Sequence, residues 1–168
     1  MFPYFYKLNK RIISDALSEK LIDYFYANEN NFSSIPDGNW YLLSDEVSKF
    51  TEVLELKNSC NIWCNVVLLK HLPNTQITRH VDGGWYRKSV LATPLLPYDN
   101  YPSTFFYDNE YDEAKATIDF SDRNSVLFNT NKYHDLKTNN FVRLNFQMVF
   151  SEPFEVVHNL LLEDKLFK

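Results

Sequence analysis

The first part of the chain has the apolar spacing of an amphipathic helix. Leu17, Leu21, Tyr24 and Phe25 fall on one face of such a helix, and the Ser14-Asp15 pair before them can cap its amino end. Asn28, Asn30 and Asn31, and then Ser, Pro and Gly residues before position 40, interrupt this spacing. We therefore predict one helix that ends near the asparagines.

A second helix is predicted shortly afterwards. Ser44 has the character of an N-cap, and two acidic residues follow it, where they suit the positive end of a helix. On this prediction Val47, Phe50 and Leu54 face the interior, and the helix frays near Lys57.

From about residue 61 the pattern changes to short runs of β-branched and aromatic residues separated by turn residues. The predicted strands cover residues 61–71, 75–82, 87–96, 103–108, 115–120, 125–129, 133–137 and 141–150. Short strands at such regular spacing favour a sandwich or barrel over a parallel sheet. We therefore predict one mainly β domain with helices over about 1–60, a β core over about 61–150 and an extension over 151–168, in which 154–163 forms a helix or a strand packed outside.

The last predicted strand has two very different faces. Its apolar face carries Val142, Leu144, Phe146, Met148 and Phe150. Its other face carries Arg143, Asn145 and Gln147. A strand this apolar should be central in its sheet, so the polar face should line an enclosed cavity. An arginine there requires an anion, and its fork suits a carboxylate.

A candidate metal site comes from three other residues. On a strand, His80 and Asp82 project to the same side. His134 lies 54 residues further on (134 − 80), near another short strand that a barrel can bring alongside. Two histidines and one carboxylate on one face of a metal leave its other positions open, as in the facial triad of non-haem Fe(II) oxygenases. Two of the chain's 3 glycines, Gly83 and Gly84, follow directly, where they let the backbone turn sharply.

Composition narrows the range of functions. The 168 residues carry 17 basic and 22 acidic side chains, a formal net charge of −5, which argues against a nucleic-acid partner. With 45% hydrophobic residues and so little glycine, the chain can bury a core and is not a disordered segment.

Targeting and redox signals are absent from the sequence. The amino end lacks the pattern of a signal peptide, and no stretch approaches the roughly 18 apolar residues that span a membrane. We therefore expect no membrane association and a cytoplasmic location. Cys60 and Cys64 lack a second Cys/His pair at zinc spacing, and we interpret them as small buried apolar residues.

Taken together, His80-x-Asp82, the distal His134 and Arg143 nine residues beyond it resemble the HxD…H…R pattern of the Fe(II)/2-oxoglutarate-dependent dioxygenases. The resemblance covers roughly residues 61–150 and implies a double-stranded β-helix, the jelly-roll or cupin-like fold. It implies that His80, Asp82 and His134 bind Fe(II), and that Arg143 pairs with the C5 carboxylate of 2-oxoglutarate. Asn145 stands where the family often has a hydroxyl residue that helps to bind this carboxylate.

The resemblance also suggests residues that contact the cosubstrate or the substrate. Arg87 and Ser89 are the first candidates, and Asn65 and Trp63 are weaker ones. The aromatic residues that can line the substrate mouth are Trp40, Trp85, Tyr86 and Tyr133.

The subgroup within the family stays open. The stretch 87–95 is similar to small prolyl-hydroxylase-like and aspartyl/asparaginyl β-hydroxylase-like members, but the latter type lacks the carboxylate ligand that this chain keeps as Asp82. Related halogenases also lack it, so its presence favours hydroxylation. The implied reaction consumes O2 and 2-oxoglutarate, releases succinate and CO2, and hydroxylates an unactivated C–H bond.

The substrate and two other functions remain open. An amino acid, a peptide or protein side chain, or a small metabolite would suit the site, and the oligomeric state is not predicted. A non-catalytic β-barrel binding module could keep the same fold. A cupin-type metal enzyme could use the same ligands without 2-oxoglutarate, although the polar row with Arg143 argues against it.

Overall fold

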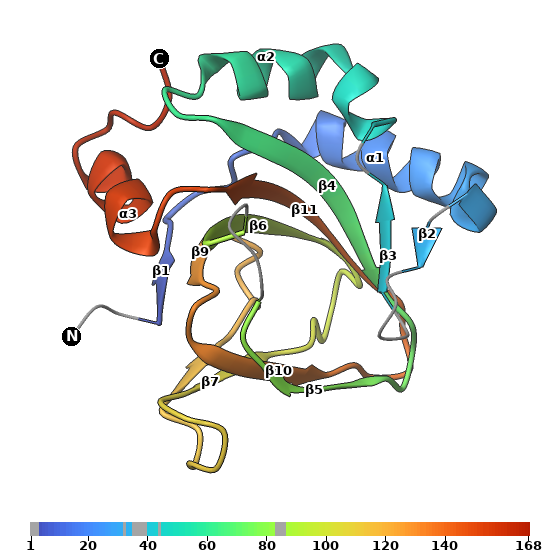
Figure 1. Ribbon diagram of the computed structural model, residues 1–168. Coiled ribbons are helices and arrows are strands. Elements are labelled where there is room, and N and C mark those ends of the chain that lie inside the picture. Colours follow the sequence, from blue (N-terminus) through green and yellow to red (C-terminus); the bar gives the residue numbers. More distant parts are fainter. Residues whose placement is uncertain (1–3, 32, 35–39, 44, 83–86) are drawn as a thin grey trace.

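The structure of the chain is a computed structural model, which describes residues 4–31, 33–34, 40–43, 45–82 and 87–168. The residues it describes form two antiparallel β-sheets and three α-helices (Figure 1). No described helix has both the length and the apolar character needed to cross a membrane.

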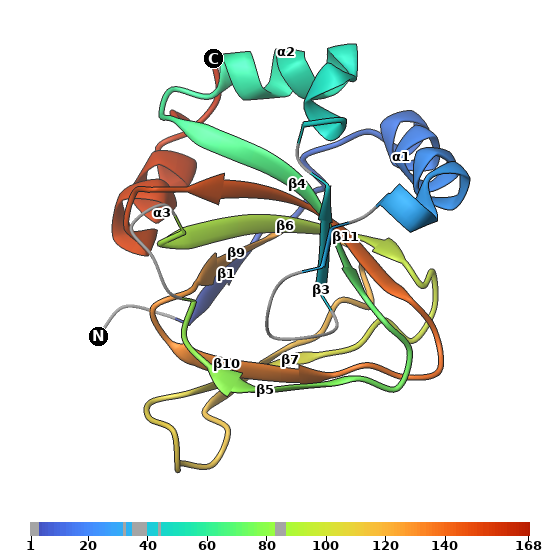
Figure 2. The same cartoon turned by 45° about the vertical axis from the view of Figure 1, so that its right-hand side comes forward.

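All eight predicted strands are present. They are β4 (Cys64–His71), β5 (Gln76–His80), β6 (Ser89–Leu96), β7 (Thr104–Tyr107), β8 (Ala116–Ile118), β9 (Val126–Asn129), β10 (Tyr133–Lys137) and β11 (Arg143–Phe150). The larger sheet has the order β1-β9-β6-β11-β4-β3-β2, and the smaller one has the order β5-β10-β7-β8. The two sheets face each other, an arrangement consistent with a jelly roll (Figure 2).

The prediction for residues 1–60 was incomplete, because this part also contributes three strands to the larger sheet. β1 (Phe5–Lys7) pairs with β9, whereas β2 (Ser33–Ser34) pairs with β3 (Trp40–Leu43), which in turn pairs with β4. These strands are short, and distant partners rather than a local alternation of residues hold β1 and β3 in the sheet. Periodicity therefore gave no sign of them.

The first helix agrees with its prediction. Helix α1 (Asp15–Ala27) begins after Ser14, whose hydroxyl accepts a hydrogen bond from the backbone N–H of Leu17. Its buried residues are Leu17, Ser18, Leu21, Ile22 and Phe25.

The second helix differs from its prediction in start and register. A 3₁₀ turn over Val47–Lys49 comes first, and α2 (Thr51–Ser59) begins only after Phe50, whose backbone is extended at φ −68° and ψ 125°. This break resets the helical phase, so Val53 is buried while Leu54 is 45% exposed. The expectation that Leu54 faces the interior was therefore wrong, and the predicted cap Ser44 lies outside the described residues.

The carboxyl-terminal segment forms a helix, one of the two forms expected for it. Helix α3 (Phe154–Leu162) packs near β9, and its Phe154 and Val157 are fully buried. Of the two cysteines, which form no disulfide, Cys64 is buried as expected and Cys60 is half-buried.

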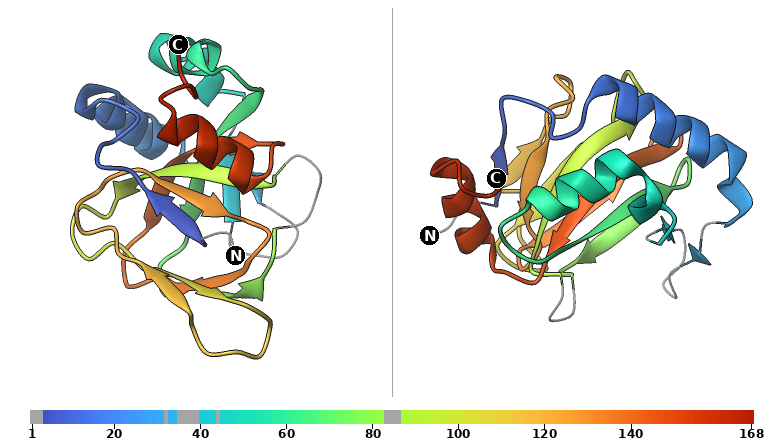
Figure 3. Two further views of the ribbon diagram at one scale, coloured as in Figure 1. Left: turned by 90° about the vertical axis from the view of Figure 1, so that its left-hand side faces the viewer. Right: turned by 90° about the horizontal axis from the view of Figure 1, so that it is seen from above.

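Two apolar cores lie on opposite faces of the larger sheet. Helices α1 and α2 cover its outer face, and the smaller sheet lies across its inner face (Figure 3). Strand β11 alternates between them as predicted: Leu144, Phe146 and Met148 join the core under the helices. The alternate residues Arg143, Asn145 and Gln147 are also buried, with 1–2% of their surface exposed. A buried polar row therefore runs along the face of β11 that is turned away from the helices.

Candidate metal centre

Three potential metal ligands meet at the end of the smaller sheet. His80 is the last residue of β5, and its backbone lies directly opposite His134 of β10 in the antiparallel register. Asp82 follows two residues later, and its backbone N–H donates to the carbonyl of Thr130 at 3.0 Å. One strand pairing and one backbone hydrogen bond therefore bring together residues that are 54 positions apart.

The donor atoms of this group converge. Oδ1 of Asp82 lies 3.3 Å from Nε2 of His80 and 3.7 Å from Nε2 of His134. One ligand atom from each residue lies within 4.8 Å of the other two, so the group can hold a metal ion. In the part of the chain that the structure describes, no other group of three His, Cys, Asp or Glu residues is arranged in this way.

Both imidazoles are oriented by the backbone. Nδ1–H of His80 donates to the carbonyl of Thr78 at 2.7 Å, and Nδ1–H of His134 donates to the carbonyl of Lys132 at 2.8 Å. Each hydrogen bond is made by the Nδ1 side of the ring and leaves Nε2 facing Asp82. Metal-binding histidines are typically held by an outer hydrogen bond of this kind.

Burial and charge affect the three ligands differently. Burial lowers the pKa of His134 below its ordinary value. Burial acts in the same direction on His80, but its hydrogen bonds to Asp82 and to the Thr78 carbonyl outweigh it and raise its pKa. Burial alone would raise the pKa of Asp82, yet the charge of Arg87 and the contacts with the two histidines hold it well below the usual 3.8. Asp82 is thus an anion throughout the neutral range.

Arg87 contacts this group directly. Its Nε–H donates to Oδ2 of Asp82 at 2.6 Å, and one terminal nitrogen donates to Oε1 of Gln147 at 3.0 Å. The sequence suggested Arg87 as a contact for the cosubstrate or substrate. In the structure its hydrogen-bonding partners are a candidate ligand and a residue of β11.

The second candidate feature is Arg143, which is 2% exposed. One terminal nitrogen donates to Nδ1 of His71 at 3.3 Å, and the other lies 3.5 Å from the hydroxyl of Thr104. Its guanidinium carbon lies 5.1 Å from the centre of the Tyr101 ring. Burial lowers the pKa of Arg143, and among the described residues no carboxylate lies within ion-pairing distance.

Unused hydrogen-bonding capacity surrounds Arg143. Its own Nε and both amide atoms of Asn145 are buried and have no hydrogen-bond partner among the described residues. Buried polar atoms are nearly always satisfied, so a set of them along one strand indicates a place for a polar ligand. The cation and the amide together suit a carboxylate.

His71, Thr104 and Tyr101 were not predicted as site residues. His71 is fully buried, and burial together with the Arg143 charge holds its pKa well below 6.5, so it is a neutral acceptor for the guanidinium. Its backbone lies opposite Arg143 in the β4–β11 register. That pairing, which follows from topology and not from any motif, was the only signal that could have found it.

The remaining candidates have separate surroundings. The hydroxyl of Ser89 donates to the carbonyl of Glu152, and the side chain of Asn65 accepts from the N–H of Val66, the next residue. Trp63 is 58% exposed, and Tyr133 is half-buried beside His134. Gly83, Gly84, Trp85 and Tyr86 lie outside the described residues, and for Trp40 the structure describes only the backbone of β3.

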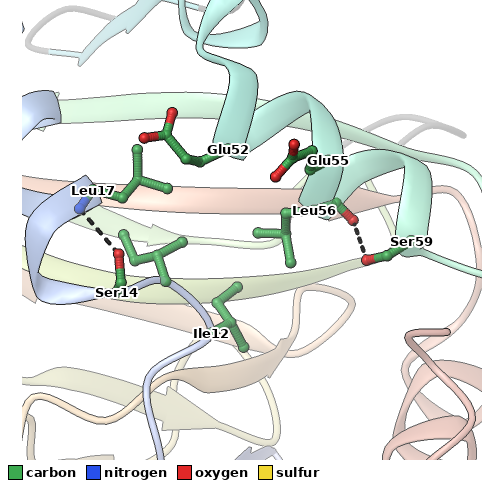
Figure 4. A pocket seen from close by; sticks show the side chains of 8 residues that line it. Ile12, Ser14, Leu17, Glu52, Glu55, Leu56 and Ser59 are labelled. Carbon is green, nitrogen blue, oxygen red and sulfur yellow. Dashed lines mark hydrogen bonds between the residues drawn. The ribbon is translucent and has the colours of Figure 1, made fainter.

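A groove outside the sheets is separate from this centre. It has a volume of about 320 Å³ and lies between the start of α1 and helix α2 (Figure 4). Its lining includes the apolar residues Leu17 and Leu56 and the acidic residues Glu52 and Glu55. None of the candidate ligands lines it.

Comparison with known proteins was informative only at the level of structure. No protein-family model matches the sequence, and no curated protein matches it. Among solved structures, a 2OG-Fe(II) oxygenase family oxidoreductase from Burkholderia pseudomallei superposes with a TM-score of 0.59 at 9% identity, over 89% of this chain and 85% of that one. The chain has the fold of the 2OG-Fe(II) oxygenases.

Two further structures agree with this assignment of the fold. The collagen prolyl hydroxylase of Paramecium Bursaria Chlorella virus-1, in its 2OG complex, has a TM-score of 0.55 at 15% identity, over 88% of this chain and 94% of that one. A non-heme alpha-ketoglutarate-dependent carbocyclase from nogalamycin biosynthesis has a TM-score of 0.57 at 11% identity, over 88% and 77% of the two chains. The predicted double-stranded β-helix agrees with these likenesses.

Proposed function

We propose that this protein is an Fe(II)- and 2-oxoglutarate-dependent dioxygenase that hydroxylates an unactivated C–H bond. The substrate in this proposal is an amino acid, a side chain of a peptide or protein, or a small metabolite. Residues 1–168 act as one domain in it, and the location is the cytoplasm. The alternative is a binding module that keeps the fold without catalysis.

Arg143 is the observation that carries the proposal. A buried cation without a counter-ion costs several kcal/mol, because desolvation is not offset by a nearby negative charge. No carboxylate of the described residues lies within ion-pairing distance of Arg143. A bound anion would satisfy it, and a dicarboxylate could reach from Arg143 toward the metal ligands along the buried face of β11.

The donor set suits Fe(II). Two imidazole nitrogens and one carboxylate oxygen converge, and together they match the two-histidine, one-carboxylate pattern of non-haem iron oxygenases. Bound iron and 2-oxoglutarate supply the oxidising chemistry that no side chain can provide.

The chain's own residues then bind and orient. His80 and His134 present Nε2, and Asp82 supplies the negative charge that partly neutralises the metal. Arg143 holds the far carboxylate of 2-oxoglutarate, with His71 and Thr104 fixing its guanidinium. Because Arg143 is buried, little bulk water reaches its guanidinium, which strengthens its interaction with the carboxylate.

The decisive experiment combines turnover with binding. Purified protein is loaded with Fe(II) without oxygen, and 2-oxoglutarate, O2 and candidate peptides or amino acids are then added. Formation of succinate and a product heavier by one oxygen atom is expected. Absence of both succinate formation and 2-oxoglutarate binding would overturn the proposal, whereas binding without turnover would favour the non-catalytic module.

Product analysis is essential, because one protein of the same fold is a carbocyclase. Succinate formation alone therefore does not distinguish hydroxylation from ring closure. Mass spectrometry of the product separates a gain of one oxygen atom from a loss of two hydrogen atoms.

Substitution of Asp82 tests the ligand assignment. Asp82→Ala removes the only carboxylate of the triad, and we expect the protein to lose its iron on gel filtration. Asp135→Ala is the matched control, since that carboxylate is also part-buried in the smaller sheet but bonds to Tyr107. Iron retained by Asp82→Ala at the level of the unmodified protein would show that the assignment is wrong.

A further inference from the structure

The two oxygens of Asp82 have different partners. Oδ1 faces both histidines, at 3.3 Å and 3.7 Å from their Nε2 atoms, whereas Oδ2 accepts a short hydrogen bond of 2.6 Å from Nε–H of Arg87. A carboxylate whose second oxygen is occupied in this way presents a single oxygen to a metal. The charge-assisted bond to Arg87 is of the strong kind.

Arg87 is itself held in place from two sides. One terminal nitrogen donates to Oε1 of Gln147, which is 2% exposed. Its backbone carbonyl accepts from the hydroxyl of Thr130 at 2.8 Å, while the carbonyl of Thr130 accepts from the N–H of Asp82 at 3.0 Å. Thr130 thus fixes the backbone of both Asp82 and Arg87, so their side chains meet in a defined geometry.

We propose that Arg87 is a positioning residue that holds Asp82 as a one-oxygen ligand and ties it, through Gln147, to the strand that carries Arg143. This inference rests on the proposed function, since it requires a metal at the triad. Because Oδ2 stays on Arg87, Asp82 takes one metal position and not two. The coordination position that a second Asp82 oxygen would take is then available to the cosubstrate or O2.

Gln147 has a defined part in this arrangement. It lies on the same face of β11 as Arg143 and Asn145, all three with 1–2% of their surface exposed. Two direct hydrogen bonds, Asp82 to Arg87 and Arg87 to Gln147, therefore connect the metal ligands to the buried polar row. Loss of the Gln147 side chain should keep the positive charge of Arg87 but leave the orientation of its guanidinium less fixed.

Metal binding without turnover is the test. Mn(II) is titrated into metal-free protein and followed by electron paramagnetic resonance, and Co(II) is added separately to record its d–d absorption, which reports ligand number and geometry. Arg87→Met should weaken Mn(II) binding about 10- to 100-fold, as loss of an outer hydrogen-bonding partner of a ligand does, and alter the Co(II) spectrum. Arg87→Lys keeps the charge but not the guanidinium that donates to Asp82 and Gln147 at the same time, and should show most of the same loss of Mn(II) affinity.

Two further variants sharpen the result. Gln147→Leu should give a smaller loss, and its effect should be less than additive with that of Arg87→Met, because both act through one contact chain. Arg79→Met is the matched control: its Nε lies 3.9 Å from Asp135, an aspartate outside the triad, so Mn(II) affinity should not change.

Each outcome bears on one claim. No Mn(II) or Co(II) binding by the unmodified protein would overturn the proposed metal site itself. Binding by the unmodified protein with equal affinity and an equal Co(II) spectrum in Arg87→Met would overturn the positioning role alone. Full affinity in Arg87→Lys would also overturn it, since charge would then suffice. If Arg87→Met fails to fold, the Arg87→Lys and Gln147→Leu titrations decide the question.

Discussion

At the scale of single residues, the buried cation Arg143 is paired with the buried neutral His71 rather than with a carboxylate. Nδ1 of His71 accepts from the guanidinium at 3.3 Å, which satisfies one donor but supplies no charge. The ligand-free protein therefore keeps an unneutralised cation in its interior. Residues arranged for a ligand commonly reduce stability in this way.

Replacement of Arg143 should separate binding from stability. In Arg143→Met we expect 2-oxoglutarate binding to weaken by about 30-fold or more, which corresponds to the roughly 2–5 kcal/mol lost when one partner of a buried charge pair is truncated. The ligand-free variant should be at least as stable as the unmodified protein, because the uncompensated charge is gone. Calorimetric titration and urea unfolding measure the two effects.

The control for this prediction is Arg123→Met. The guanidinium of Arg123 donates to the carbonyls of Pro94, Leu95, Pro97 and Tyr98. Its loss should destabilise the protein and leave affinity for 2-oxoglutarate unchanged. A large drop in stability in Arg143→Met would contradict the view that Arg143 lacks a counter-ion.

His71 predicts a specific pH dependence of stability. Burial and the Arg143 charge hold its pKa well below 6.5 in the native state. The unfolded chain therefore binds one more proton than the native state once the pH falls below about 6.5, so His71 makes stability decrease with falling pH by up to about 1.4 kcal/mol per pH unit. His71→Gln keeps an acceptor for Arg143 but removes the titration. Urea unfolding of metal-free protein at about pH 7.5 and pH 5.5 should show a smaller decrease in the variant, and equal decreases would contradict the prediction.

At the scale of elements, strand β11 shows why most of the fold could be predicted. Its alternation assigned Phe146 to one core and Arg143 to the buried polar row before any partner strand was known, because a strand places successive residues on opposite faces. Strands β1 and β3 have too few residues to establish such a pattern. The extended backbone of Phe50, which delays α2, has no signature in the apolar spacing at all.

The same reasoning explains what could be predicted of the site. The spacing of His80 and Asp82 gave two candidate ligands from one predicted strand, although β5 ends at His80 and Asp82 lies two residues beyond it. His134 followed from its place in the pattern. The contact between Arg87 and Asp82, and the pairing of His71 with Arg143, depend on how distant segments meet. Side-chain partners of this kind cannot be found from periodicity.

Core packing along β11 gives a prediction at this scale. Phe146 is fully buried under the helices, so Phe146→Ala should reduce the free energy of unfolding by about 3–5 kcal/mol. Phe141, which precedes the strand and is 51% exposed, provides the comparison, and Phe141→Ala should change stability by only about 0.5 kcal/mol. Similar losses in both variants, measured by urea unfolding, would contradict the assignment of Phe146 to the core.

At the scale of the whole molecule, the two faces of the larger sheet pack against different elements. The outer face packs against α1 and α2 through an apolar core, while the inner face shares a second apolar core with the smaller sheet and carries the polar row. The two candidate histidine ligands come from the smaller sheet, Asp82 follows its strand β5, and the anion-binding residues come mainly from the larger sheet. A dicarboxylate bound between them would therefore contact both sheets.

The sheet order places His80 on a strand with one neighbour. Within the described residues, β5 is the end strand of the smaller sheet and bonds only to β10, which carries His134. A metal held by both histidines would cross-link this outermost strand to the rest of the sheet. Hydrogen exchange should then detect it: Mn(II) should slow amide exchange in β5 far more than in the central strand β11, and equal slowing in both would contradict the cross-link. Iron supply would in that case determine how stably the end strand β5 stays paired with β10, independently of any catalytic turnover.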